Sequence, residues 1–176
     1  MSKLYMKQKI FSWKDRFTIK DQNDNDRYSV EGEFFSIGKK LHIYDMNDNE
    51  VAFVHQKVLT LLPRFFVFVN GTQVAEIVKE FTFLKPRYRI EGLNWEVQGD
   101  ILDHDYQITE NGREIVGIHK VWFSWGDSYE LDIADAAFSG AGAYGSGITD
   151  SNSEVMVLAI DCVMDDSESA AYSSTN

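Results

Sequence analysis

The residues with the most suggestive spacing for chemistry form a glycine run, residues 140–145 (Gly-Ala-Gly-Ala-Tyr-Gly), which matches the pattern G-x-G-x-x-G. In dinucleotide-binding proteins such glycines form a tight strand-to-helix turn that brings a pyrophosphate to the helix N-terminus. Here the predicted helix begins several residues too late, at Glu154, and no strand follows it. We therefore interpret residues 139–153, which are rich in Gly, Ala and Ser, as a flexible connection without a nucleotide.

Two acidic stretches, residues 21–26 and 45–49, resemble the beginning of a calcium-binding loop. Such a loop needs glycine at its sixth position and a bidentate glutamate at its twelfth. The first stretch has Asp26 and Gly32 at those positions, and the second has Glu50 and Gln56. We therefore expect both stretches to be hairpin turns, and we predict no metal site and no cofactor.

Side chains that could act as nucleophiles or bases are scattered along the chain. The single thiol, Cys162, lies in an apolar segment, where burial as a small hydrophobic side chain is expected. The four histidines fall on separate predicted strands or turns, and no nucleophile-elbow motif is present. We therefore predict that the protein is not an enzyme. Asp161 leaves two interpretations open: a functional buried carboxylate, or, as we favour, one that hydrogen-bonds backbone or solvent near a helix end.

A basic stripe is the strongest candidate for a binding surface. Lys85, Arg87 and Arg89 share the parity of a predicted strand, so all three should project from the same face. Tyr88 and Ile90 would point the other way, into the core. Such a stripe can contact the phosphates of lipid headgroups, although the solvated exterior of a barrel also carries rows of charges. We name Lys85, Arg87 and Arg89 as candidate anion-binding residues.

The charge balance limits the kinds of partner. The chain of 176 residues has 17 basic and 28 acidic side chains, a net charge of −11, and no Lys or Arg follows Lys120. A nucleic acid is disfavoured, because phosphate binding requires a basic face. An anionic membrane surface or a protein stays open as a partner, since an acidic protein can carry a local basic patch. Without the apolar region of a signal peptide or an apolar run near the ~20 residues of a membrane-spanning helix, we expect a cytoplasmic protein.

Turn signals divide residues 7–133 into short β-rich segments. Asn70-Gly71 and Asn111-Gly112 each separate two of them, and Asn-Gly is a strong hairpin signal because both residues adopt positive φ. Arg27–Gly32 is similar to Arg87–Gly92, which indicates repeated meander units. About twelve strands are predicted, over residues 7–13, 16–20, 27–31, 36–44, 51–58, 65–69, 73–79, 87–91, 94–98, 106–109, 114–123 and 128–133.

A C-terminal apolar segment predicts a helix over residues 154–164. After Glu154 its one polar side chain is Asp161, and Ser151 with Glu154 matches an S-x-x-E capping box. A helix that is apolar all round must be enclosed, and this one is too short to cross a bilayer. The side chains expected in the helix core are Val157, Leu158, Ile160 and Asp161.

About twelve strands leave a barrel lumen that needs filling. We therefore predict a mainly β fold, a closed barrel of about twelve strands around a central hydrophobic C-terminal α-helix. A sandwich with the helix against one sheet is the alternative, but it would leave part of an apolar helix in water. Residues 1–164 then form a single barrel domain with the plug helix 154–164, and the polar residues 165–176 form a flexible tail.

Motifs spread over about residues 5–164 occur in colinear order and resemble the LURP-one-related family. They are Lys7-Gln8-Lys9-Ile10, Gly32…Gly38, Lys57-Val58-Leu59-Thr60-Leu61-Leu62-Pro63, Phe81-Thr82-Phe83-Leu84-Lys85-Pro86, Trp95…Gly99, His104-Asp105-Tyr106, Trp122-Phe123-Ser124-Trp125-Gly126-Asp127-Ser128-Tyr129 and Leu158-Ala159-Ile160-Asp161. The resemblance implies the tubby C-terminal-like fold, a twelve-stranded barrel around a central hydrophobic helix. The connection 139–153 is longer than the family leads us to expect.

The resemblance implies a fold more than an activity, because bacterial members of the family have no established one. Related folds include phosphoinositide-binding tubby domains and phospholipid scramblases, but their binding residues do not align with this chain one by one. We expect a non-enzymatic binding or regulatory module that contacts an anionic partner such as lipid headgroups. An intracellular structural or protein-interaction domain without a small ligand is the alternative.

Overall fold

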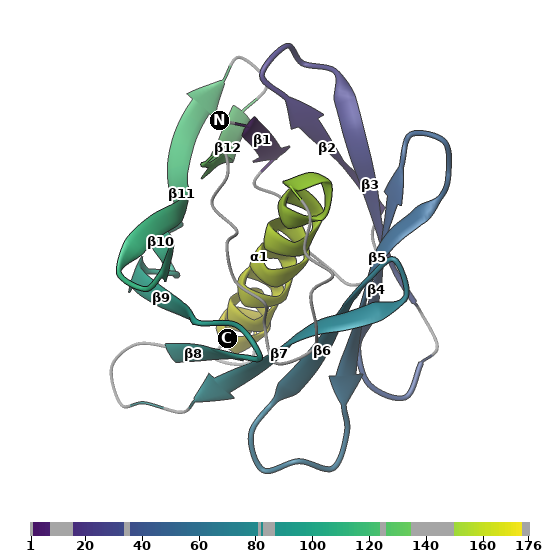
Figure 1. Cartoon of the computed structure of the whole chain (residues 1–176), viewed down its shortest axis with the longest axis vertical. Helices are drawn as coiled ribbons and strands as arrows, with labels where there is room; N and C mark the ends of the chain where they lie inside the picture. Colours follow the sequence, from purple (N-terminus) through teal and green to yellow (C-terminus); the bar gives the residue numbers. More distant parts are fainter. Residues whose placement is uncertain are drawn as a thin grey trace.

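A computed structural model of the chain describes residues 2–7, 16–33, 36–80, 82, 87–123, 126–134 and 150–173. Over these residues the chain forms twelve strands and one helix, and the strands make a closed antiparallel barrel around the helix (Figure 1), which confirms the predicted fold class. Each strand pairs with the next along the chain, and β1 also pairs with β12. The strands are β1 Ser2–Lys7, β2 Phe17–Asp21, β3 Asp26–Gly32, β4 Lys40–Asp45, β5 Glu50–Lys57, β6 Arg64–Val69, β7 Thr72–Glu80, β8 Arg87–Glu91, β9 Trp95–Asp100, β10 Asp105–Glu110, β11 Arg113–Phe123 and β12 Gly126–Ile133.

The first strand lies earlier in the chain than predicted. β1 covers Ser2–Lys7, and the predicted strand 7–13 lies, apart from Lys7, outside the described part of the chain. Leu4 and Met6 are buried, and all six residues pair with β12. The alternation Ser-Lys-Leu-Tyr-Met-Lys is what a strand with one buried face requires, so this short period-2 pattern accounts for β1.

Two kinds of connection alternate around the barrel. Because neighbouring strands are antiparallel, the connections after even-numbered strands emerge at one end, which we call the turn end, and those after odd-numbered strands at the other, the loop end. At the turn end the Asn-Gly signals form tight hairpins, with φ of 48° and 77° at Asn70 and Gly71. At the loop end the described residues include 36–39 after β3 and 58–63 after β5.

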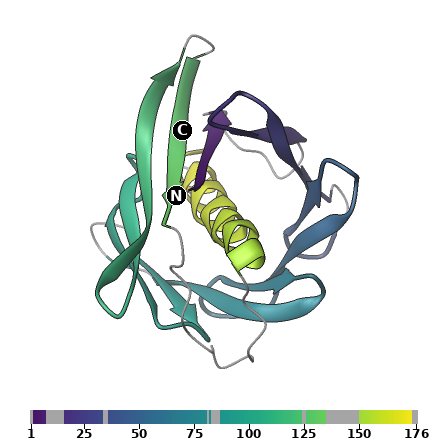
Figure 2. The same cartoon turned by 45° about the horizontal axis from the view of Figure 1, so that its top comes forward.

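The helix α1 spans Asp150–Ser173 and runs through the barrel (Figure 2). This corrects the predicted boundaries of 154–164, because nine residues of the predicted tail 165–176 continue the helix. No Gly or Pro interrupts the sequence from Asp150 to Ser173, and alanines at 170 and 171 favour a helix. None of the helical residues described forms a stretch both long and apolar enough to cross a bilayer.

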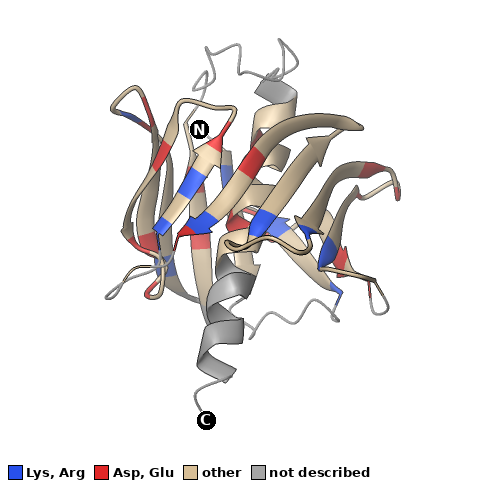
Figure 3. Cartoon of the chain, turned by 90° about the horizontal axis from the view of Figure 1, so that it is seen from below, with Lys and Arg blue, Asp and Glu red and all other residues tan. Residues whose placement is uncertain are grey.

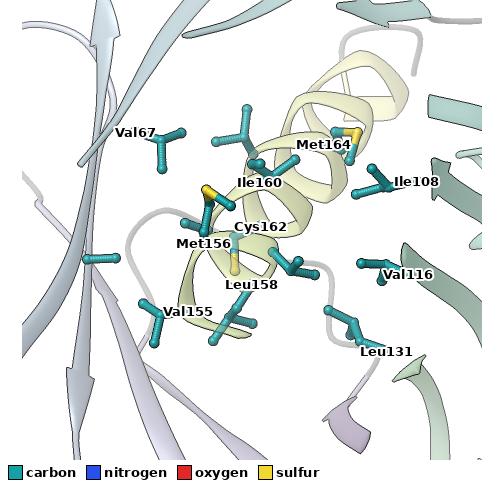
Figure 4. Close-up of a cluster of buried hydrophobic side chains, with 14 of the residues drawn as sticks. Val67, Ile108, Val116, Leu131, Val155, Met156, Leu158, Ile160, Cys162 and Met164 are labelled. Carbon is teal, nitrogen blue, oxygen red and sulfur yellow. The ribbon is translucent and has the colours of Figure 1, made fainter. Parts of the chain in front are cut away.

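The lumen is filled by α1 (Figure 4). Val157, Leu158 and Ile160 have no exposed surface, and every residue from Val155 to Met164 is buried. Since a helical turn takes 3.6 residues, this run is enclosed on every side. Wall side chains that face it include Val67, Ile108, Val116 and Leu131. Burying one Leu or Ile contributes about 1.5–3 kcal/mol, so α1 is an integral part of the core.

Candidate functional site

Asp161, the polar residue within the buried part of α1, is bonded to the barrel wall. Its carboxylate accepts a hydrogen bond from the hydroxyl of Tyr106 on β10, and both residues are buried. The sequence favoured backbone or solvent as the partner and did not indicate Tyr106, because strand parity alone does not say which wall residue faces a given turn of the helix. A buried hydrogen-bonded pair fixes the rotation of α1 in the lumen, which favours a structural role for Asp161.

The beginning of α1 is held by a second polar cluster, at the turn end. The Glu154 carboxylate accepts hydrogen bonds from the hydroxyls of Ser2 and of Tyr28, the latter at 2.8 Å. The Arg27 guanidinium lies 3.5 Å from the same carboxylate. Burial raises the pKa of the Tyr28 phenol, and the charge of Glu154 raises it further, so the hydroxyl stays a donor. Glu154 thus binds the barrel wall, where the sequence predicted a capping box with Ser151.

The acidic stretches and the single thiol have local structural roles. The carboxylates of Asp21 and Asp45 accept hydrogen bonds from main-chain N–H groups two and four residues later, at 2.8–3.0 Å, so both stretches are hairpin turns. Cys162 is buried in α1. Among the described residues, no group of three His, Cys, Asp or Glu side chains could hold a metal ion. The glycine run 140–145 lies outside the described residues.

The basic stripe lies on the outer wall of the barrel, at β8. Arg87 and Arg89 are exposed, and Lys85 is outside the described residues. Tyr88 and Ile90 are buried, as the alternation along the strand predicts. Two of the three candidate anion-binding residues are therefore available at the surface.

Acidic side chains surround Arg89. Its guanidinium lies 2.8 Å from Glu91 and 3.6 Å from Glu80. Glu91 is also 3.6 Å from Arg64, which bonds Glu76 at 2.6 Å. Two arginines and three glutamates thus share one network, and both signs of charge are interspersed over the wall (Figure 3). Anion binding by the basic stripe stays a prediction, and these ion pairs weaken it.

Apolar side chains project into solvent at the loop end, a feature that the sequence analysis missed. Ile37 is 84% exposed, Leu59 103% and Leu61 99%, and Val58 beside them is 41% exposed. Of the five large hydrophobic side chains exposed in the described part of the chain, these are four. Exposed apolar side chains that cluster in one place mark an interaction site. We call residues 36–39 and 58–63 the apolar loop pair.

The two loops of the pair lie against each other. The first loop is bonded to β5, because the Gln56 N–H donates to the Lys39 carbonyl at 2.7 Å and the Lys39 N–H donates to the Gln56 side chain at 3.1 Å. Gly38, with φ of 82°, lies so close to Val58 that an added Cβ would be 2.8 Å from its Cγ1. Leu59 also has positive φ, 60°, which costs a non-glycine residue about 1–3 kcal/mol unless its surroundings hold it. The exposed tips of both loops are therefore held in defined positions where the loops contact each other.

Lysines border the apolar loop pair. Lys39 belongs to it, Lys40 and Lys57 flank it, and Lys40 lies 2.9 Å from the Glu33 carboxylate. The turn end has the opposite composition, because its turns hold only Asn, Asp, Gln and Gly apart from Met46 and Leu93. The turns of one end are therefore polar, whereas the apolar loop pair at the other end is apolar and bordered by lysines.

The outer wall of β4, β5 and β6 carries aromatic and imidazole side chains, and we call this surface the ring face. Its half-buried members are His42, Tyr44, Phe53, His55, Phe66 and Phe68. Ring centroids lie 4.8 Å apart between His42 and Phe53, and 6.0 Å apart between Phe53 and Phe68. The run Phe65-Phe66-Val67-Phe68 is apolar at inward and outward positions alike, so its sequence gives no sign of which side is exposed.

The protein belongs, by its fold, to the class of closed antiparallel barrels that enclose a C-terminal helix. The X-ray structure of a protein from Arabidopsis thaliana is similar, with a TM-score of 0.62 over 95% of this chain and 91% of that one. At 13% sequence identity this likeness shows the fold alone.

The family model of LURP-one-related proteins matches residues 2–138, so the chain belongs to the LURP-one-related family. A protein of Bacillus subtilis (strain 168), described as uncharacterized protein YxjI, is 42% identical over 134 residues, which make up 76% of this chain and 83% of that protein. The resemblance seen in the sequence motifs is thereby confirmed. Neither match brings an activity, so the function must be argued from the site.

Proposed function

We propose that this protein is a non-catalytic module that binds anionic lipid surfaces through the apolar loop pair. The observation that carries the proposal is the exposure of Ile37, Leu59 and Leu61 on two adjoining loops bordered by lysines. Aliphatic tips beside basic residues are the pattern with which peripheral proteins enter the boundary between headgroups and acyl chains. The lumen, where a small substrate could otherwise lie, is occupied by α1 from Val155 to Met164.

The expected strength follows from the two contributions. Full burial of a Leu or Ile contributes about 1.5–3 kcal/mol, and partial insertion of three tips gives a fraction of that each. Each lysine near an anionic surface adds about 1 kcal/mol. Repulsion by the net charge of −11 opposes both, although it is screened beyond about 8 Å at physiological salt. Binding should therefore be weak to moderate, and part of it should survive physiological salt.

Vesicle co-sedimentation tests the proposal. We expect the protein to sediment with vesicles of phosphatidylcholine and phosphatidylserine, and less with phosphatidylcholine alone. The double variant Leu59→Ser, Leu61→Ser should bind about tenfold more weakly or worse, since 1.4 kcal/mol corresponds to a factor of ten. Met46→Ser, which changes an exposed apolar side chain at the turn end, is the matched control and should bind like the parent. Absence of binding by the parent at low salt would refute the proposal.

A further inference from the structure

The ring face continues from the apolar loop pair without a break. Lys57 and Arg64 pair in register where β5 ends and β6 begins, and loop 58–63 joins them. The Lys57 Nζ lies 5.6 Å from the centroid of the Phe66 ring, the first outward ring along β6 after Arg64. Moving from the loop tips along the wall, one therefore meets aliphatic side chains, then cations, then rings.

We infer, on the basis of the proposed function, that the apolar loop pair and the ring face are one lipid-binding surface, so that the barrel lies obliquely on the bilayer with its β4–β6 wall. The aliphatic tips would enter below the phosphates, Lys57 would lie at the level of the phosphates, and the rings would lie at the boundary. Aromatic side chains favour that boundary because they combine an apolar body with a polarisable face.

The charges of the ring face fit an anionic surface better than its acidic residues suggest. Glu33 and Glu50 each lie within hydrogen-bond distance of His42, at 3.1 and 2.6 Å. Glu76 accepts a hydrogen bond from Arg64 at 2.6 Å. Glu33 also accepts a hydrogen bond from Lys40 at 2.9 Å, so Glu33 and Glu76 each have a cationic partner, which reduces their repulsion of lipid phosphates.

The direction of α1 favours the wall over an end-on approach. The helix begins at the turn end, where Glu154 binds Tyr28, and it runs toward the loop end, where it ends at Ser173. A barrel standing on its loop end would bring the carbonyl end of α1, where the helix dipole is negative, toward anionic lipids. An oblique contact on β4–β6 engages the loop tips while avoiding that repulsion.

Site-specific fluorescence distinguishes these orientations. Because the single native thiol, Cys162, is buried in α1, a cysteine introduced at the surface can be labelled selectively. We would label Leu61→Cys in the loop pair, Phe68→Cys on the ring face and Gln98→Cys on the outer wall of β9 with a polarity-sensitive nitrobenzoxadiazole dye. Phe53→Cys replaces Phe68→Cys if thermal unfolding shows that the latter does not fold. Each is titrated with vesicles of phosphatidylcholine and phosphatidylserine.

We expect the dye at 61 and at 68 to shift to the blue and gain intensity with vesicles, and the dye at 98 to stay unchanged. A response at 61 with none at 68 would overturn the oblique orientation and leave the proposed function standing. A response at 68 that rises with protein concentration without vesicles would show that a second protein copy covers the ring face, which also overturns it. No response at any position, together with no co-sedimentation of the parent, would refute both proposals.

Discussion

The phenol of Tyr106 and the carboxylate of Asp161 are bonded to each other inside the barrel, across the boundary between wall and helix. The two residues are 55 positions apart in sequence, and both are buried. Since burial of an acceptor without a donor costs a large part of its hydration free energy, the pair ties the position of α1 to that of β10.

Tyr106→Phe should therefore destabilise the fold by about 1–3 kcal/mol, because the Asp161 carboxylate loses a donor while remaining buried. Urea unfolding followed by circular dichroism measures this. The matched control is Tyr129→Phe, since the Tyr129 hydroxyl faces the weak acceptor Met6 Sδ at 3.6 Å and should cost less. Equal losses for the two variants would contradict a special role for the Tyr106–Asp161 pair.

Leu158→Asp should prevent folding, because it places an unpaired charge in a lumen with no exposure to water. Leu61→Asp introduces the same charge at a fully exposed position and should change the free energy of unfolding by no more than about 0.5 kcal/mol. Solubility and thermal unfolding of the two variants provide the comparison. A folded Leu158→Asp protein with the parent's melting temperature would be incompatible with a buried central helix.

Stability should fall at alkaline pH because two phenols, Tyr28 and Tyr5, have raised pKa values in the folded protein. Burial raises the pKa of Tyr28 above its usual value of 10.0, and burial with the neighbouring Glu130 raises the pKa of Tyr5 to about 12. In the unfolded chain both phenols ionise near pH 10, so their contribution is complete below that pH and is lost as pH rises through the folded-state values. Chemical unfolding at a series of pH values should show a decline beginning near pH 10.

Tyr28→Phe isolates this effect from the titration of lysines in the same range. The variant should be less stable than the parent at neutral pH, because Glu154 loses a donor, and its alkaline decline should be shallower. Parallel curves for parent and variant above pH 10 would show that Tyr28 does not contribute.

The basic stripe has its own test in the triple variant Lys85→Gln, Arg87→Gln, Arg89→Gln. Because Arg89 is already paired with Glu80 and Glu91, we expect this variant to lose less vesicle binding than Leu59→Ser, Leu61→Ser. Its melting temperature should change little, since exposed ion pairs contribute about 0–1 kcal/mol. Complete loss of vesicle binding by the triple variant would show that the lipid contact lies at β8 and not at the apolar loop pair.

The barrel and its helix could be predicted because the signals are local. Asn70-Gly71 and Asn111-Gly112 fix two hairpins by their own backbone preferences, and an apolar run around Leu158 has to be enclosed. The ends of α1 could not be predicted in the same way. The sequence predicts that Glu154 caps the helix. In the structure its carboxylate accepts a hydrogen bond from Tyr28, a residue 126 positions away, and such a partner is known only once the fold is known.

The apolar loop pair escaped prediction for a related reason. The run from Val58 to Leu62 follows a strand without alternation, and nothing in the sequence says whether another element covers it. Only the finished barrel shows Leu59 and Leu61 in solvent. For Arg89 the spacing along the strand correctly predicted an exposed side chain. Its partner Glu80 lies on β7, however, and the register between β7 and β8 cannot be derived from the sequence pattern of β8.

The pairing of β1 with β12 governs when this protein can fold during its synthesis. The first strand made has to wait for the last one before the wall is continuous, and α1 follows β12 along the chain. A growing polypeptide therefore presents an unfilled, apolar inner surface until α1 leaves the ribosome. Long-range closure of this kind is slow, and the open intermediate is prone to aggregate. Productive folding of the barrel thus waits for α1, which completes the core.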